Sequence, residues 1–281
     1  MAKKQERGPK TIPSPLNNPM TNYSEYYMSA AEKILAALVL FLAGGMVGLV
    51  FYGGLFKREG AATLATHISN AVVFALVGFI AVRVFMSAVR NMLKGRRDKA
   101  LRIQFRDMLE AIATSLASGN TVMDSFRNAR SDLLNQYSEQ DLIIQELTEI
   151  QAGLDNGQTL ETMLSAFGER SGNEDIQNFS NVISNCFRIG GDFKTAVRKT
   201  RDMIGEKMAI EDEIRTKVAS NKLQHNAMCI MPIVLVALIK KMSSSFDENL
   251  ASPIGVVATT VAVAIFVGSY FWGRKIIDIE G

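Results

Sequence analysis

Cysteine is scarce in this chain, and charge is absent from four long stretches of it. The two cysteines, Cys186 and Cys229, do not make a disulfide framework, and their scarcity fits a reducing compartment. Asp, Glu, Lys and Arg are absent from residues 34–56, 60–82, 223–239 and 251–273. Three of these runs are 23 residues long and the remaining one is 17. Because a helix needs about 20 apolar residues to cross a bilayer, the sequence predicts four transmembrane helices, of which residues 223–239 are marginal in length.

Most of the charged residues lie between the second and third apolar runs. Residues 83–222 hold 20 of the 31 Lys and Arg residues and 20 of the 28 Asp and Glu residues. A balanced, densely charged stretch of this length predicts a soluble domain that buries a core of its own. The balance argues against nucleic acid as a partner, since no net basic field is present to release counterions.

A polar segment precedes the first apolar run and contains Pro9, Pro13, Pro15 and Pro19. Its composition predicts disorder over residues 1–22. The next tyrosines, Tyr23, Tyr26 and Tyr27, are expected either at the lipid headgroups or in an ordinary linker. The domain plan is then a disordered or interfacial segment over 1–30, a transmembrane pair over 31–82, a cytoplasmic helical domain over 83–222, and a second transmembrane pair with a short tail over 223–281.

Basic residues predict the orientation of the chain. Six of them directly follow the second run: Arg83, Arg90, Lys94, Arg96, Arg97 and Lys99. Positively charged loops stay in the cytoplasm, so we expect the N-terminus, the helical domain and the C-terminus on the cytoplasmic side. Lys240 and Lys241, which this topology places outside, fit it least.

Three short segments of the central domain repeat one pattern: residues 119–126, 157–164 and 190–197. Each begins with Gly, has Thr or Asp two residues later, and has apolar residues three and seven positions after the Gly. A Gly in the left-handed conformation commonly ends a helix, and Thr or Asp caps the start of the next one. The pattern predicts three helical hairpins that turn at Gly119, Gly157 and Gly190.

Apolar residues recur at helical spacing on both sides of these turns, and no stretch of the domain alternates like a strand. The expected fold class is all-α, with four transmembrane helices flanking a six-helix cytoplasmic bundle. We expect the bundle helices at roughly 97–118, 122–132, 140–155, 160–171, 174–189 and 192–221. In the first apolar run, Gly44 and Gly48 lie on one helix face and predict close packing against a neighbouring membrane helix.

The sequence offers little chemistry of the kind that enzymes use. Residues 190–195 contain Gly and then Lys-Thr, but Phe193 precedes the Lys and a helix precedes the loop, which argues against a phosphate-binding loop. His225 and Cys229 share a helix face, but two ligands make only half of a zinc site. We expect no enzyme activity, no cofactor and no metal, and a domain that contacts other proteins.

Three basic residues near the last turn allow two interpretations. Arg198, Lys199 and Arg201 are expected to form either a solvated helix face or a basic face that docks an acidic partner.

Two segments of the domain resemble the F domain of type II secretion systems. One runs from Phe105 to Val122; the other covers residues 187–193 and continues as a charged helix to Lys222, before a membrane run that contains Pro232. The layout over roughly residues 30–275 resembles the platform proteins of tight-adherence (Tad) pili. Many related platform proteins carry two F domains, so a single domain favours the tight-adherence branch or an archaeal-like relative.

This resemblance implies a platform protein of the cytoplasmic (inner) membrane that couples a hexameric assembly ATPase to pilin polymerisation. The implied partners are that ATPase, pilin subunits, membrane lipid, and a second platform protein or further copies of the chain. Gly190, Gly191 and Asp192 match the family pattern best, and with Gly119 and Arg188 they are candidate partner contacts; the other interpretation is a purely structural turn. The alternative function is a small membrane transporter or channel subunit with a regulatory helical domain.

Overall fold

The structure is a computed structural model, and it describes residues 10–55 and 63–279. The chain divides into two compact units. The first combines the N-terminal residues up to Tyr27 with Asn91–Ala209 and is called here the helical domain. The second combines Met28–Arg90 with the residues from Ile210 onward and is called the apolar unit.

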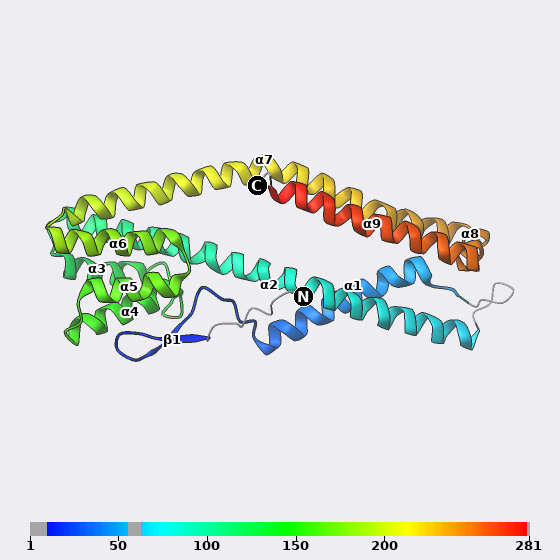
Figure 1. Cartoon of the computed structure of the whole chain (residues 1–281), viewed down its shortest axis with the longest axis horizontal. Helices are drawn as coiled ribbons and strands as arrows, with labels where there is room; N and C mark the ends of the chain where they lie inside the picture. Colours follow the sequence, from blue (N-terminus) through cyan, green and yellow to red (C-terminus); the bar gives the residue numbers. More distant parts are fainter. Residues whose placement is uncertain (1–9, 56–62, 280–281) are drawn as a thin grey trace. The chain divides into compact units, whose positions relative to one another are not determined.

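The regular structure of the described residues is helical except for one small hairpin, so the predicted all-α fold class is confirmed (Figure 1). The hairpin consists of β1 (Thr11–Pro13) and β2 (Pro19–Thr21), which pair antiparallel. The helices of the described ranges are α1 (Ala30–Tyr52), α2 (Leu64–Ala117), α3 (Val122–Leu133), α4 (Leu142–Asp155), α5 (Leu160–Ser171), α6 (Glu174–Ile189), α7 (Phe193–Met242), α8 (Ser244–Ala251) and α9 (Pro253–Ile279).

The predicted helix boundaries agree closely with α3, α4, α5 and α6, because each of these helices begins and ends at a local signal. The residues of the predicted helices over 97–118 and 192–221 are helical but belong to the longer, unbroken α2 and α7, so the predicted start at residue 97 is wrong. Gly95 lies inside α2 and a Cβ there would meet open space. An interior glycine costs only about 1 kcal/mol relative to alanine, which is too little to end a long helix.

The core of the helical domain is made by the apolar faces that the sequence periodicity indicated. Phe105 of α2 is 1% exposed, and its ring packs edge-on against Phe167 of α5 and Phe179 of α6, with centroids 6.1 and 5.5 Å away. Full burial of a phenylalanine side chain contributes roughly 1.5–3 kcal/mol. Phe187 of α6 is 41% exposed, and its ring lies against that of Phe193, with centroids 5.7 Å apart.

The N-terminal segment is ordered, so the predicted disorder is wrong for residues 10–22; residues 1–9 lie outside the described residues. The β1–β2 hairpin belongs to the helical domain. Tyr23 is 1% exposed in the core, which overturns its expected place at the lipid headgroups. Its hydroxyl donates to Glu146 of α4, a partner 123 positions away that local composition does not reveal.

In the apolar unit, α1 and α2 approach closely along their glycines. A Cβ on Gly44 would lie 2.4 Å from the Cβ of Ala81, and one on Gly48 would lie 2.9 Å from Val77. Phe41 and Phe74 pack edge-on beside this contact, with centroids 5.4 Å apart. Glycine at these positions lets two membrane helices make backbone contact.

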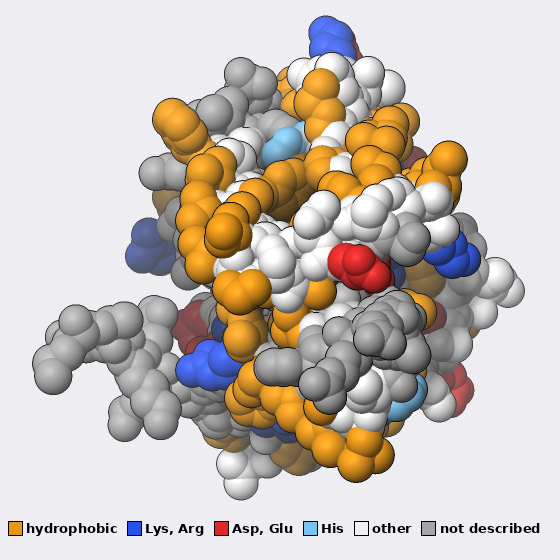
Figure 2. Space-filling model, turned by 90° about the vertical axis from the view of Figure 1, so that its right-hand side faces the viewer, with side chains coloured by type: hydrophobic (Ala, Val, Ile, Leu, Met, Phe, Trp, Pro, Cys, Tyr) orange, Lys and Arg blue, Asp and Glu red, His pale blue; other side chains and the backbone are white. Residues whose placement is uncertain are grey.

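Four helices in the described part of the chain, α1, α2, α7 and α9, contain stretches long and apolar enough to cross a membrane. Their apolar side chains point outward: Ile34 and Phe79 are 68% exposed and Trp272 is 73% exposed. Figure 2, which views the molecule from the end near α8, shows hydrophobic side chains over much of the visible surface. An apolar surface of this extent is stable in lipid and not in water.

Candidate functional site: the glycine turns of the helical domain

Each of the three repeated segments forms a left-handed glycine turn, as predicted. The φ angles are +89° at Gly119, +80° at Gly157 and +79° at Gly190. Only glycine adopts this region without a steric penalty. The sequence repeat therefore reflects three similar helix ends.

The predicted caps follow each of these glycines. The backbone N–H of Asp124 donates to the Thr121 hydroxyl (3.1 Å) at the start of α3. The N–H of Thr162 donates to Thr159 (3.2 Å) at the start of α5. In the third turn, the N–H of Thr195 donates to the carboxylate of Asp192 (3.1 Å). Thr and Asp were thus placed correctly as helix starters, because capping acts over three residues only.

The three turns lie at the same end of the helical domain (Figure 1). Successive helices run in opposite directions, so the α2–α3, α4–α5 and α6–α7 connections fall at one end and the other two connections at the opposite end. We call the surface formed by residues 118–121, 156–159 and 190–192 the glycine-turn end. Sequence reasoning identified the turns but not their common location, which follows from the bundle.

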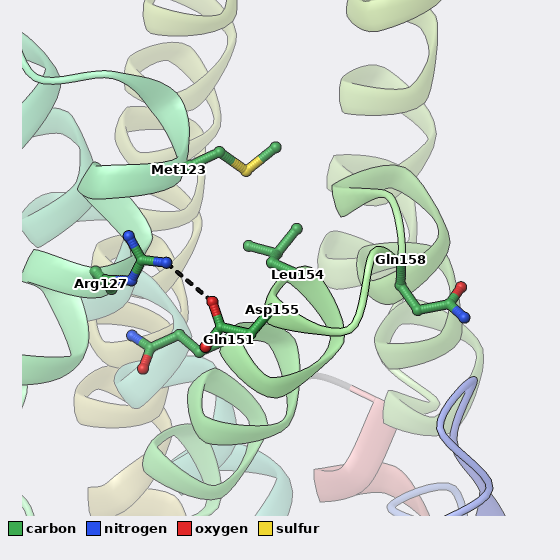
Figure 3. A pocket seen from close by; sticks show the side chains of 6 residues that line it. All are labelled: Met123, Arg127, Gln151, Leu154, Asp155 and Gln158. Atoms are coloured by element: carbon green, nitrogen blue, oxygen red, sulfur yellow. Dashed lines mark hydrogen bonds and ion pairs between the residues drawn. The ribbon is translucent and has the colours of Figure 1, made fainter.

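A shallow pocket adjoins the first and second turns (Figure 3). Arg127 of α3 reaches across it to Asp155 of α4, with 2.9 Å between Nη2 and Oδ1. Met123 and Leu154 supply its apolar lining, and the hollow has a volume of about 190 Å³. The pocket is open to solvent and large enough for one apolar side chain of a partner.

The third turn holds four of the predicted contact residues, and their roles differ. The N–H groups of Gly190 and Gly191 both donate to the carbonyl of Cys186, at 3.0 and 2.8 Å, and so close α6. Hydrogen bonds from the Thr195 hydroxyl and backbone lower the pKa of the Asp192 carboxyl. Arg188 is exposed, and its guanidinium donates to Asn185 (3.1 Å).

These contacts distinguish the residues that hold the turn in shape from those whose side chains a partner could reach. The side chain of Asp192 caps the first amides of α7, where a bound phosphate would otherwise be held. Ile189, which sequence reasoning did not single out, is 78% exposed at the end of α6. The side chains of Ile189 and Arg188 are therefore both accessible at this turn.

The expected basic face near the third turn is only partly present. Arg201 of α7 pairs with Glu110 of α2 at 3.1 Å and with its neighbour Asp202 at 2.6 Å. Arg106 pairs with Asp107 at 2.8 Å in the same open groove of about 730 Å³. Arg201 is therefore neutralised by carboxylates, while Arg198 and Lys199 remain exposed.

The pair expected to share a helix face in α7 does so. The Sγ of Cys229 lies 3.8 Å from Nε2 of His225, and the imidazole stacks on Tyr270 of α9 with centroids 5.8 Å apart. No group of three or more potential metal ligands comes together in residues 10–55 and 63–279.

A buried polar cluster in the helical domain was missed by sequence reasoning. Glu146 of α4 is fully buried, and Arg170 of α5 donates to it at 2.6 Å. Burial raises the pKa of Glu146, and the Arg170 charge opposes that shift. Glu146 lies on the same helix face as Ile143 and Ile150. A charge within that apolar stripe was the available signal, because buried carboxylates are paired.

Comparison with protein-family models, with curated proteins and with solved structures finds no match to this chain. We therefore infer its function from its own residues and contacts and from the resemblance described above.

Proposed function

We propose that the chain is a multi-pass platform protein of a type IV-like (tight-adherence) pilus or type II secretion machine, in the cytoplasmic membrane. In this role it couples a cytoplasmic assembly ATPase to pilin polymerisation and catalyses no reaction itself. One observation carries the proposal. A domain of helical hairpins with glycine turns lies in the sequence between two pairs of apolar helices, and α2 and α7 each continue from an apolar stretch into that domain.

Continuous helices suit a protein that transmits movement. A helix is stiff along its axis because every backbone N–H and C=O in its interior is bonded within it. α2 and α7 each join the helical domain to an apolar stretch without an intervening loop, and Pro232 interrupts the backbone hydrogen bonds of α7 only within its apolar stretch. This continuity supports an assembly platform, which has to pass movement from its soluble domain to its membrane helices.

The proposed orientation places both termini and the helical domain in the cytoplasm. Lys240, which then lies near the outer surface, is engaged in two contacts. Its ammonium group pairs with Asp247 of α8 at 3.1 Å and donates to the carbonyl of Gly53 at 2.8 Å. Because the charge of Lys240 is neutralised by Asp247, this lysine is only weak evidence against an external location of the loop. Single cysteines introduced at positions 58 and 245 should both react with a membrane-impermeant thiol reagent from outside the cell.

The glycine-turn end is the surface that we propose for the ATPase. Ile189 and Arg188 would make the contact, and Gly119, Gly190, Gly191 and Asp192 would hold the turns in shape. Ile189 combines high exposure with a fixed helix end, so little conformational entropy is lost when it is buried by a partner. Pilin subunits, membrane lipid, and a second platform protein or further copies of this chain complete the proposed partners; nucleic acid is not among them.

Affinity purification in mild detergent from the native cells, followed by mass spectrometry, tests the proposal. We expect a secretion-type ATPase, a pilin or a second F-domain protein to accompany the wild-type chain. Ile189→Glu should lose the ATPase, whereas Met203→Glu, an equally drastic change at an exposed position of α7, should retain it. Recovery of none of these partners, while other membrane complexes stay intact, would overturn the platform function.

A transporter or channel subunit is the second candidate, and the contact between His225, Cys229 and Tyr270 favours it. Polar groups inside a membrane helix pair are often functional. Solute or ion flux through proteoliposomes that contain the purified protein, abolished by His225→Leu, would support this candidate instead.

A further inference from the structure

The N-terminal segment is bonded to the helical domain at three separate places. We call residues 10–25 the strap. At the first place, the Ser14 hydroxyl donates to Glu149 of α4 at 2.5 Å, and the Asn18 amide donates to the same carboxylate at 3.2 and 3.1 Å. Ser14 and Glu149 are 7% and 8% exposed, so this contact excludes most water.

The second place is centred on Tyr23. Its hydroxyl donates to Glu146 at 3.0 Å, and the other oxygen of that carboxylate accepts from Arg170. The backbone N–H of Tyr23 donates to the carbonyl of Arg170 at 2.9 Å. All three side chains are at most 3% exposed. The strap thus adds one hydrogen bond to the carboxylate of this buried ion pair.

The third place joins the end of the strap to α2. One nitrogen of Arg97 donates to the carbonyls of Tyr23 (2.6 Å) and Glu25 (3.1 Å). The Arg97 guanidinium also lies over the ring of Tyr26, 5.1 Å from its centroid. Nearby, Gly172 makes room for the strap, since a Cβ there would lie 2.7 Å from the Cα of Ser24.

The first apolar helix begins directly beyond this third contact. Ser29 is the N-cap of α1, only four residues after Glu25. Four residues of extended chain span at most about 14 Å. The chain between the bonded end of the strap and α1 is therefore short, and it lengthens when the strap comes off the helical domain.

We propose that the strap is a latch, which keeps the free chain in front of α1 short while it is closed and which opens as one unit. Its contacts are hydrogen bonds from Ser, Asn, Tyr and Arg, which water replaces when the strap leaves. Tyr23 supplies its one large buried apolar surface. Loss of either polar contact therefore loosens the whole strap. This device does not depend on which function the chain serves.

Hydrogen exchange of the full-length protein in detergent, read by mass spectrometry, tests the latch. Tyr23→Phe removes one donor to a carboxylate, and we expect exchange across residues 12–23 to accelerate together by about tenfold. Tyr137→Phe is the matched control, because the Tyr137 hydroxyl donates to Asp107 at 2.6 Å outside the strap. The control should leave strap exchange at the wild-type rate.

A second variant tests whether the strap opens as a unit and guards against misfolding of the first. Ser14→Ala with Asn18→Ala breaks the contact to Glu149 and the two turn hydrogen bonds that the Ser14 hydroxyl accepts from the N–H groups of Leu16 and Asn18. A latch predicts faster exchange at the peptide that contains Tyr23 as well, although no bond of Tyr23 has been changed. Faster exchange confined to residues 14–18, or unprotected exchange of the strap in the wild type, would overturn the proposal.

Discussion

Replacing Gly190 by alanine isolates the conformational requirement of the third glycine turn. The residue has φ of +79°, and a Cβ built on it meets no atom within 4 Å. Any loss of stability therefore comes from the backbone conformation and not from a clash. Gly205 of α7 supplies a matched control, because a Cβ there also meets nothing within 4 Å, while its backbone is helical.

The two substitutions should change stability in opposite directions. An L residue held in the left-handed region costs about 1–2 kcal/mol, so Gly190→Ala should destabilise the helical domain by that amount. Gly205→Ala should stabilise the domain by about 0.5–1 kcal/mol, because alanine loses less backbone entropy in a helix. Gly190→Val should be worse than Gly190→Ala, since a β-branched residue tolerates positive φ least.

Cys186 provides a native reporter for the measurement. It is half-buried, and its carbonyl accepts the N–H groups of both turn glycines. In full-length protein with Cys229→Ala, pulse labelling of Cys186 along a urea titration in detergent gives an unfolding midpoint. With a slope of about 2 kcal/mol per molar urea, the middle of the usual range, Gly190→Ala should lower the midpoint by roughly 0.5–1 M. Equal midpoints for the two alanine variants would refute the assignment of Gly190 as an obligatory left-handed helix end.

Three further predictions concern other contacts. Gly44→Val should disrupt the α1–α2 contact and lower the melting temperature in detergent, and Ala81→Gly should partly rescue it. Gly268→Val is the control and should be tolerated, because a Cβ on Gly268 meets open space. Arg170→Leu should destabilise the helical domain by about 3–5 kcal/mol in urea titrations because it strands a buried carboxylate, and adding Glu146→Leu should recover much of that loss. Burial and the Asp107 hydrogen bond raise the pKa of Tyr137 from 10.0 to about 12. The resulting stabilisation is complete below pH 10 and lost as the pH rises through about 12, and an ultraviolet titration of Asp107→Asn should show Tyr137 ionising at lower pH.

Local signals in the sequence were sufficient for most helix ends. Gly119, Gly157 and Gly190 act on the residues next to them, and Thr121, Thr159 and Asp192 cap amides three positions away. Such effects involve only residues within one turn of helix, so the local sequence is enough to predict them. The predicted disorder of residues 10–22 failed because Ser14 and Tyr23 find their partners on α4, more than 120 positions later.

The candidate site was predictable in its parts but not in its arrangement. The glycine turns were identified, yet Ile189 was not, because its exposure depends on which face of α6 meets α5. The pairing of Arg201 with Glu110 likewise depends on α2 and α7 lying together in the helical domain.

By itself, the sequence determined the four apolar helices, the all-α fold and the three glycine turns. The preference for lipid or water and the local backbone conformation depend on each residue and its nearest neighbours, so the sequence alone predicts them. Only the tertiary structure decided that the turns share one end of the domain, that Glu146 and Arg170 form a buried pair, and that the N-terminal strap closes over them. Those outcomes depend on which surfaces meet, and that is set by the packing of the whole bundle.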